Sequence, residues 1–246
     1  MTPAIRWPTH GTGALRPPYV YDALYARKDY ESEVAFAVDQ FDAHGNDGDR
    51  ALLVGCGTGR HSVFLRERGF EVTGVDPNPA MLDRARERSD GTFLSGGGLP
   101  GIESSFEADR AFDLVWVPYT VLNYLEPDRL ADALTSMTGV LADGGVLVLD
   151  VGDFPSMDGP TLQVPPAADR DCARLYQYRH GRGNRTRMNA LVFFGEEWFT
   201  DTHTLTFFDE GTIADSLGEL GYAVETYDWY EGAPTAMPDP AVVVAH

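Results

Sequence analysis

The sequence predicts an α/β protein in which a doubly wound, mostly parallel sheet carries an inserted antiparallel β-layer. As far as residue 151, apolar strand-length segments alternate with helix-length segments, which is typical of a parallel sheet covered by helices on both faces. Residues 146–151, VLVLDV, form the continuous apolar run that a strand buried on both faces requires. Residues 152–208 instead alternate polar and apolar side chains between turns, which indicates antiparallel strands.

The elements of the core follow from periodicity and from their boundary residues. A helix-spaced segment begins at Tyr19, and the polar turn DAHGNDGDR separates it from the first strand. The helix that begins at Pro127 should run to Leu141 and end at Asp143–Gly145, because glycine commonly ends helices. The other expected elements are strands 51–54, 71–75, 91–95 and 113–117, helices 60–68 and 79–89, and, after the insert, helix 209–220 and strands 223–229 and 241–245.

Four segments organise the chain. Residues 1–18 are rich in Pro and Gly and should form a mobile or wrapping N-terminal segment, and residues 19–151 should form the ligand-binding core. Residues 152–208 should form the antiparallel insert over the ligand site, with turns at Gly181–Asn184 and Gly195. The last segment, residues 209–246, should complete the core sheet.

The stretch from Arg50 to Asp76 predicts a nucleoside-binding site. An apolar strand runs into glycines at every second position, a helix follows, and the next strand ends on the acid. Glycines let the backbone approach a ligand, a helix N-terminus presents free N–H groups, and a carboxylate at a strand end can accept both ribose hydroxyls. A dinucleotide fingerprint would need glycine at position 60, where this chain has Arg60, so NAD is disfavoured.

The G-C-G-T-G motif and the following V-D-P-N-P resemble class I S-adenosylmethionine-dependent methyltransferases. With YDALYARKDYESE, FDLVWVPYTVLNYL and LTFFDE, the chain is similar to the branch that methylates amino groups of nucleotide-linked sugars. The resemblance runs from Tyr21 to the C-terminus. It implies a Rossmann-like sheet of seven strands with one antiparallel strand in its final hairpin, S-adenosyl-L-methionine as cofactor, and a small-molecule acceptor. An amine nitrogen is the first expectation, and an oxygen acceptor is the alternative.

The resemblance also implies cofactor residues. The opening tyrosines would cover the methionine end, Asp76 would hold the ribose, and backbone after the fourth strand would receive the amino group. The full set is Tyr21, Tyr30, Gly55, Cys56, Gly57, Gly59, Asp76, Pro77, Met81, Gly97, Val117 and Pro118. Two positions depart from the family: Leu53 and Gly97 stand where it usually has acids. A cofactor-binding domain without catalysis is therefore a further alternative.

Methyl transfer is an in-line displacement that needs alignment and an unprotonated acceptor. The catalytic candidates are Tyr124, where some family members carry a histidine, and His203, on the alternating segment THTLTFF. The candidates for acceptor binding are Tyr119, Asn123, Tyr178 and Trp198, with residues 152–208 as the substrate cap. Aromatic residues on strands equally suit a subunit interface, so a homo-oligomer through the insert is an alternative prediction.

Charge and composition indicate which partners, cellular location and cysteine chemistry to expect. The chain has 246 residues and a net charge of −19, with 38 acids against the single lysine Lys28, which disfavours nucleic acid as a partner. Acids spread along the whole chain suit a high-salt cytoplasm, so a halophilic source is a hypothesis. No membrane-length apolar stretch or signal peptide is evident, so we expect a cytoplasmic protein. Cys56 and Cys172 lack metal-ligand spacing, and we expect neither a metal nor a disulfide.

Overall fold

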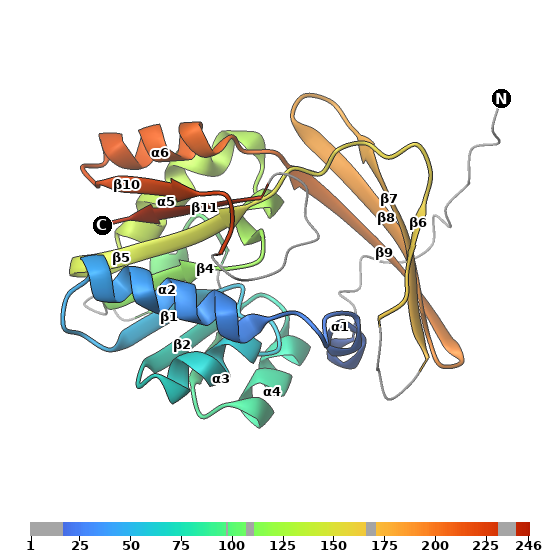
Figure 1. The fold of residues 1–246 in the computed structure, drawn as a ribbon, viewed down its shortest axis with the longest axis horizontal. Coiled ribbons are helices and arrows are strands. Elements are labelled where there is room, and N and C mark those ends of the chain that lie inside the picture. Colours follow the sequence, from blue (N-terminus) through green and yellow to red (C-terminus); the bar gives the residue numbers. More distant parts are fainter. Residues whose placement is uncertain (1–16, 97, 107–110, 166–170, 231–239) are drawn as a thin grey trace. The chain divides into compact units, whose positions relative to one another are not determined.

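The computed structural model describes residues 17–96, 98–106, 111–165, 171–230 and 240–246. The chain divides into two compact units (Figure 1). Among the described residues, an antiparallel unit is formed by those in 17–27 and 154–205, and a sheet unit by those in 28–153 and 206–246.

The sheet unit is built on seven strands in the order β10-β11-β5-β4-β1-β2-β3. Strand β11 is antiparallel to both β10 and β5, and the other neighbours are parallel. This arrangement confirms the predicted doubly wound fold and its final hairpin. The strands are β1 (Arg50–Val54), β2 (Glu71–Asp76), β3 (Thr92–Ser95), β4 (Phe112–Val117), β5 (Leu141–Val151), β10 (Val224–Tyr227) and β11 (Ala241–Ala245).

Alternating side chains of the buried strands supply two separate cores, one on each face of the sheet. On β1, Leu52 and Val54 pack in the core that includes residues of α5 and α6. Their neighbours Ala51 and Leu53 pack in the core that includes residues of α2, α3 and α4. The helices are α2 (Tyr30–His44), α3 (Arg60–Glu67), α4 (Pro79–Arg88), α5 (Leu130–Thr138) and α6 (Glu210–Glu219), with short turns η1 (Ile102–Ser105), η2 (Val121–Tyr124) and η3 (Pro127–Arg129).

Side-chain caps set where three of these helices begin. Asp29 accepts a hydrogen bond from the Ser32 N–H at 3.0 Å, so α2 starts at Tyr30 and is separate from α1 (Pro18–Leu24). Asn78 and Asp209 cap α4 and α6 in the same way. The prediction of one continuous opening helix was therefore wrong, because a capping aspartate interrupts it.

The predicted end of the helix after Pro127 was also wrong. The helix stops at Thr138, and Asp143–Gly145 lie inside β5. The β4–β5 register moves from Phe112 opposite Leu141 to Leu114 opposite Val146, so β5 carries extra residues in an irregularity. Gly144, at φ +69°, supplies the left-handed backbone of that irregularity, a role that sequence alone does not separate from a helix C-terminus.

The antiparallel unit contains a four-stranded sheet in the order β6-β7-β8-β9, which confirms the predicted antiparallel insert. Its strands are β6 (Thr161–Gln163), β7 (Cys172–His180), β8 (Arg185–Phe194) and β9 (Glu197–Thr206). One small core joins Val20 and Leu24 of α1 to Cys172, Val192 and Phe194 of the strands. Helix α1 therefore packs on this sheet.

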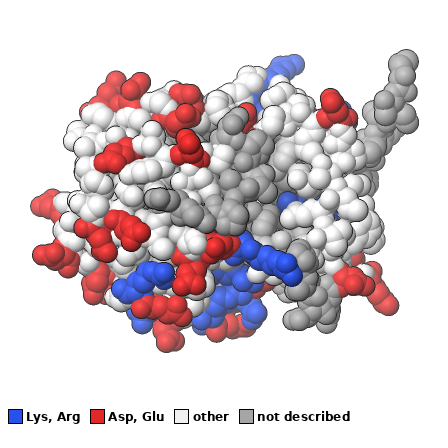
Figure 2. All heavy atoms as spheres, in the orientation of Figure 1, with Lys and Arg blue, Asp and Glu red and all other residues white. Residues whose placement is uncertain are grey.

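On the face of the sheet unit in Figure 2, acidic side chains are widely spread and basic side chains lie among them. On α4, the guanidinium of Arg84 lies 2.7 Å from Glu87 and that of Arg86 lies 2.8 Å from Asp83. These arginines are therefore partnered by neighbouring acids. Among the described residues, no helix combines the length and the apolar character needed to span a bilayer.

Candidate active site

The glycine loop after β1 and the acid that ends β2 are joined by hydrogen bonds. The N–H groups of Gly55 and Cys56 donate to the carbonyl of Val75 at 2.9 and 3.0 Å. The Gly57 N–H donates to one oxygen of Asp76 at 3.0 Å, and the Asn78 N–H donates to the other at 2.8 Å. The loop and the carboxylate therefore form one preorganised unit.

Two features of this unit fit the ribose of a nucleoside cofactor. Each oxygen of Asp76 accepts one backbone N–H, and a carboxylate has about four acceptor positions, so capacity for two hydroxyls remains. A Cβ placed on Gly57 would meet no protein atom within 4 Å, so the chain leaves space beside that backbone. Burial raises the pKa of Asp76 above its ordinary value, against the effect of both backbone hydrogen bonds.

The other two glycines are required by packing. A Cβ on Gly55 would lie 2.5 Å from Val121, and one on Gly59 would lie 2.9 Å from the Cβ of Ala85. All three glycines have left-handed backbone, with φ between +54° and +75°. Gly57 alone of the three has open space beside it, which makes it the residue to test for ligand contact.

We expect Gly57→Val to weaken binding of S-adenosyl-L-methionine, the cofactor that the sequence resemblance implies, at least about tenfold, because the branched side chain enters the open space beside the glycine backbone. Gly69→Val is the matched control, since Gly69 also has left-handed backbone and open space around its Cβ but lies in the turn after α3. Both variants should lose comparable stability in thermal unfolding. Equal cofactor affinity of the two variants in calorimetry would contradict the placement of the ligand at Gly57.

The loop after β4 is held in an unusual conformation by a buried acid. Tyr119 and Thr120 have left-handed backbone, at φ +64° and +57°, which is uncommon outside glycine. Asp150 at the end of β5 accepts both of their N–H groups, the former at 2.6 Å, and also the hydroxyl of Tyr230 at 2.6 Å. Trp116 donates its indole N–H to that hydroxyl at 3.0 Å. The network fixes the backbone that follows Val117 and Pro118.

Asp150 is fully buried, and burial raises its pKa to about 6 despite the hydrogen bonds from Tyr230 and the loop. The same burial, with the nearby Asp150 charge, raises the pKa of Tyr230. A neutral tyrosine therefore donates to the carboxyl group. We interpret Asp150 as the residue that positions the β4 loop.

A polar cluster surrounds Tyr30 at the start of α2. Glu33 is almost fully buried, pairs with Lys28, and lies 2.8 Å from Nε2 of His61. The Lys28 ammonium lies 4.5 Å from the Tyr30 ring centre and 4.9 Å from that of Tyr119, within cation–π range. The rings of His61 and Tyr30 meet edge to face, with centroids 4.9 Å apart.

The neighbouring charge and hydrogen bond keep the Glu33 carboxyl group of this cluster ionised. Burial acts to raise the pKa of Glu33, but the hydrogen bond from His61 and the Lys28 ammonium lower it overall. Burial also lowers the pKa of His61, so a neutral imidazole donates through Nε2. The cluster thus holds one buried acid, one ammonium and aromatic faces beside the β4 loop residue Tyr119.

The remaining predicted cofactor residues occupy varied environments. Met81 is buried on α4, and Pro77 is exposed directly after Asp76. Cys56 is buried in the core that includes residues of α2, α3 and α4, and burial raises the pKa of its thiol. Tyr21 lies on α1 of the antiparallel unit, whereas Tyr30 belongs to the sheet unit. Gly97 lies outside the described residues.

The predicted acceptor and catalytic residues differ in exposure. Tyr124 in η2 is 53% exposed and Trp198 on β9 is 59% exposed. The ring of Tyr178 on β7 contacts those of Phe154 and Tyr176. His203 on β9 has its Nε2 atom 2.8 Å from Oδ1 of Asp201.

The side chain of Asn123 is buried and hydrogen-bonded to the backbone, as is typical of a residue that supports the fold. It is fully buried, and its amide nitrogen donates to the carbonyls of Gly152 and Thr206 at 3.1 and 2.8 Å. Its amide oxygen accepts the Gly152 N–H at 3.2 Å. We interpret Asn123 as a link that holds η2 to the two chain segments where the insert leaves and rejoins the core.

Sequence reasoning did not identify Glu33, Asp150 or Tyr230 as site residues. Asp150 is the single acid in the apolar run 146–151, and a charge in a strand buried on both faces signals a buried partner network. Glu33 and Tyr230 gave no comparable signal, because their partners come from distant parts of the sequence.

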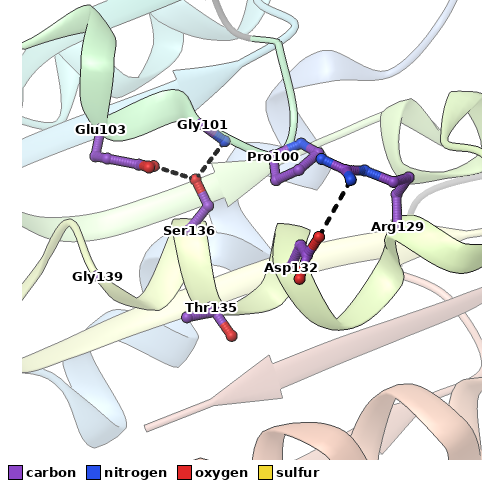
Figure 3. Close-up of a pocket in the computed structure, with 8 residues that line it drawn as sticks. All are labelled: Pro100, Gly101, Glu103, Arg129, Asp132, Thr135, Ser136 and Gly139. Carbon is purple, nitrogen blue, oxygen red and sulfur yellow. Dashed lines mark hydrogen bonds and ion pairs between the residues drawn. The ribbon is translucent and has the colours of Figure 1, made fainter.

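A separate hollow of about 450 Å³ lies between η1 and α5 (Figure 3). Its polar groups bond one another: the N–H groups of Gly101 and Ile102 donate to Ser136 Oγ at 2.9 Å, and Ser136 donates to Glu103. Arg129 pairs with Asp132 at 3.3 Å. We assign no function to it. The lining residues are Pro100, Gly101, Glu103, Arg129, Asp132, Thr135, Ser136 and Gly139.

Comparisons with known proteins fit this geometry. Residues 51–145, which hold the glycine loop, Asp76 and the β4 loop, match the family described as a methyltransferase domain. This part of the chain is a methyltransferase domain. The resemblance stated from sequence is thereby confirmed, and S-adenosylmethionine is the cofactor.

Two solved structures cover almost the whole methyltransferase. DesVI of Streptomyces venezuelae has a TM-score of 0.77 at 26% identity, over 92% of this chain and 96% of that one. CalS10, an amino pentose methyltransferase of Micromonospora echinaspora, has a TM-score of 0.74 at 28% identity, over 96% and 99%.

Coverage of curated relatives varies. YqeM of Bacillus subtilis (strain 168) is 26% identical over 233 residues, 89% of this chain and 91% of that protein. A relative from Geobacillus sp. (strain WCH70) is 30% identical over 142 residues, and the chain spans only 58% of its length.

Proposed function

We propose that the methyltransferase transfers a methyl group from S-adenosylmethionine to the amino nitrogen of a nucleotide-linked amino sugar. The observation that carries this proposal is the match to an amino pentose methyltransferase over 96% of this chain. The match therefore extends beyond residues 51–145 and includes the antiparallel unit. The net charge of −19 also favours a small-molecule acceptor over nucleic acid.

Within this proposal the sheet unit holds the cofactor, which when bound supplies an electrophilic methyl group on a sulfonium. Asp76 accepts the ribose hydroxyls, and the backbone of Gly57 lies against the nucleoside. Met81 and Pro77 flank the adenine, and the loop held by Asp150 receives the amino group. The Tyr30 cluster, with the buried Glu33 carboxylate, contacts the methionine end.

The acceptor must present a lone pair, so it must react as the neutral amine. We assign His203, whose Nε2 atom lies 2.8 Å from Asp201, as the base that takes up the ammonium proton, and the Tyr124 hydroxyl as a group that orients the nitrogen. Tyr119, Tyr178 and Trp198 supply aromatic surface to the acceptor. The rate should then rise with pH as the acceptor amine deprotonates.

We expect Trp198→Ala and Tyr124→Phe to lower turnover about 100-fold while S-adenosylhomocysteine affinity changes less than about twofold, since a 1 Å misalignment costs on that order. Phe193→Ala is the matched control, because Phe193 is a second exposed aromatic of the antiparallel sheet, 45% exposed against 59% for Trp198. It should keep its turnover. Parallel loss of turnover and cofactor affinity would mean that these residues support the fold or a subunit interface, and mass measurement in solution would identify the latter.

The deciding experiment is a methyl-transfer assay with a panel of nucleotide-linked amino sugars and, beside them, carboxylic acid acceptors. Methylation of the amine supports the proposal. Methylation of the acids alone would favour an O-methyltransferase, since a malonyl-[acyl-carrier protein] O-methyltransferase of Salmonella typhimurium (strain LT2) is 35% identical over 109 residues, 43% of this chain and 41% of that protein. Cofactor binding without turnover on any acceptor would favour a regulatory domain, an alternative motivated by Leu53, which is fully buried in the core.

A further inference from the structure

Two histidines and a glutamate from three separate segments of the sheet unit converge on one point. His44 is the last residue of α2, Glu225 lies in β10, and His246 directly follows β11. Nε2 of His44 lies 3.5 Å from Oε1 of Glu225, and Nε2 of His246 lies 3.7 Å from the same oxygen. One ligand atom from each of the three residues lies within 4.8 Å of the other two.

The two nitrogen–oxygen separations are close to those between ligands of one tetrahedral metal ion. Zinc bonds to nitrogen and to carboxylate oxygen are about 2.0–2.2 Å long, so two ligand atoms of a tetrahedral site lie about 3.3–3.6 Å apart. Two imidazoles with one carboxylate, and water in the remaining position, form a common donor set for this ion. The geometry points to a zinc-binding site formed by His44, Glu225 and His246, and we propose that the protein binds one Zn²⁺ there.

The backbone and the neighbouring side chains hold the three ligands in place. Ala223 and His246 exchange N–H···O hydrogen bonds of 2.9 and 3.0 Å, which extend the β10–β11 pairing. Because Glu225 lies opposite Val244, Glu225 and His246 project from the same face of the hairpin as diagonal neighbours. Two of the three ligands are therefore fixed by strand register.

Tyr227 orients the carboxylate from behind. Its hydroxyl oxygen lies 2.7 Å from Oε2 of Glu225 and 3.0 Å from the Gln40 side-chain oxygen, one helical turn before His44. This leaves Oε1 as the oxygen that faces both histidines. Hydrogen-bonded partners behind a ligand are a regular feature of metal sites.

The surroundings favour a cation and give it access. His44 ends α2, where the helix dipole is negative, and the chain carries a net charge of −19. The histidine side chains are 22% and 24% exposed, and Glu225 is 46% exposed. The imidazole rings stack at 3.9 Å with an interplanar angle of 22°, so binding requires one ring to rotate until both Nε2 atoms face the ion. Bound zinc would join the end of α2 to the C-terminal hairpin.

The test is a calorimetric titration of untagged, chelator-treated full chain with Zn²⁺, beside thermal unfolding. We expect one equivalent of Zn²⁺ to bind. A free Zn²⁺ concentration 100 times the dissociation constant should raise Tm by about 5 °C. His44→Ala, His246→Ala and Glu225→Gln should each weaken binding at least about 100-fold, and Tyr227→Phe about 10-fold. His180→Ala, which removes a histidine of the antiparallel unit, should bind as the parent does.

Co²⁺ supplies a second readout, because its visible absorption distinguishes low-coordinate protein ligation from hydrated ion. Unfolding in chelator shows whether each variant is folded before its affinity is compared. Failure to bind one equivalent at 100 µM Zn²⁺, at about neutral pH, would overturn the proposal, as would binding that survives in the double variant His44→Ala/His246→Ala. The site shares none of the proposed cofactor or acceptor residues, so its outcome is independent of the methyl-transfer assay.

Discussion

Asp76→Ala should reduce the affinity for S-adenosylhomocysteine by about 10- to 150-fold, because hydrogen bonds to a charged group contribute about 1.5–3 kcal/mol. The Asp76 carboxylate has acceptor capacity beyond its two backbone hydrogen bonds. Its removal also frees the Gly57 N–H, which now holds the glycine loop to β2. Calorimetric titration of parent and variant measures both effects as one loss of affinity.

Two further variants separate charge from loop structure. Asp76→Asn keeps the size of the side chain and loses its charge, so we expect an intermediate affinity. Asp83→Ala removes an exposed acid of α4 that pairs with Arg86, and it should bind as the parent does. If Asp76→Ala binds the ligand normally while Asp83→Ala does not, the ribose site has been assigned to the wrong acid.

Much of the sheet unit could be predicted because its signals are local. The glycine loop, the acid at the end of β2 and the apolar run of β5 each lie within a few residues, and the structure places them as expected. The missed helix break at Asp29 depended on a single side-chain cap within a continuous helical pattern. The irregularity in β5 was missed because Gly144 serves equally well as a helix end or a strand irregularity.

The groups that position the site could not be predicted, because they act through contacts with residues that are distant in the sequence. Asp150 contacts Tyr119, Thr120 and Tyr230, and none of these is its neighbour in sequence. The proposed zinc ligands have the same character, and the expectation of no metal rested on cysteine spacing alone. A single sequence shows residue types and short spacings, but it does not show which distant residues come into contact in the folded chain.

The network around Asp150 should therefore be the most sensitive part of the sheet unit to substitution. Asp150→Ala should lower the free energy of unfolding by about 3–5 kcal/mol, because it leaves buried donors of Tyr119, Thr120 and Tyr230 without their acceptor. Asp143→Ala removes an exposed acid of the same strand, so it should change stability by less than about 0.5 kcal/mol. Chemical denaturation of the three proteins measures these differences.

The pH dependence tests the same residue independently. The pKa of Asp150 is raised from its ordinary value of 3.8 to about 6, so the folded protein binds this proton more tightly than the unfolded chain. Its share of the free energy of unfolding is then largest below about pH 4, falls as the pH rises, and is fully lost above about pH 6. Asp150→Asn lacks the titrating group, so the stability of the parent relative to this variant should fall across that window. A difference that stays constant from pH 4 to pH 7 would show that the pKa of Asp150 is not raised, and that the β4 loop rests on an ionised carboxylate throughout.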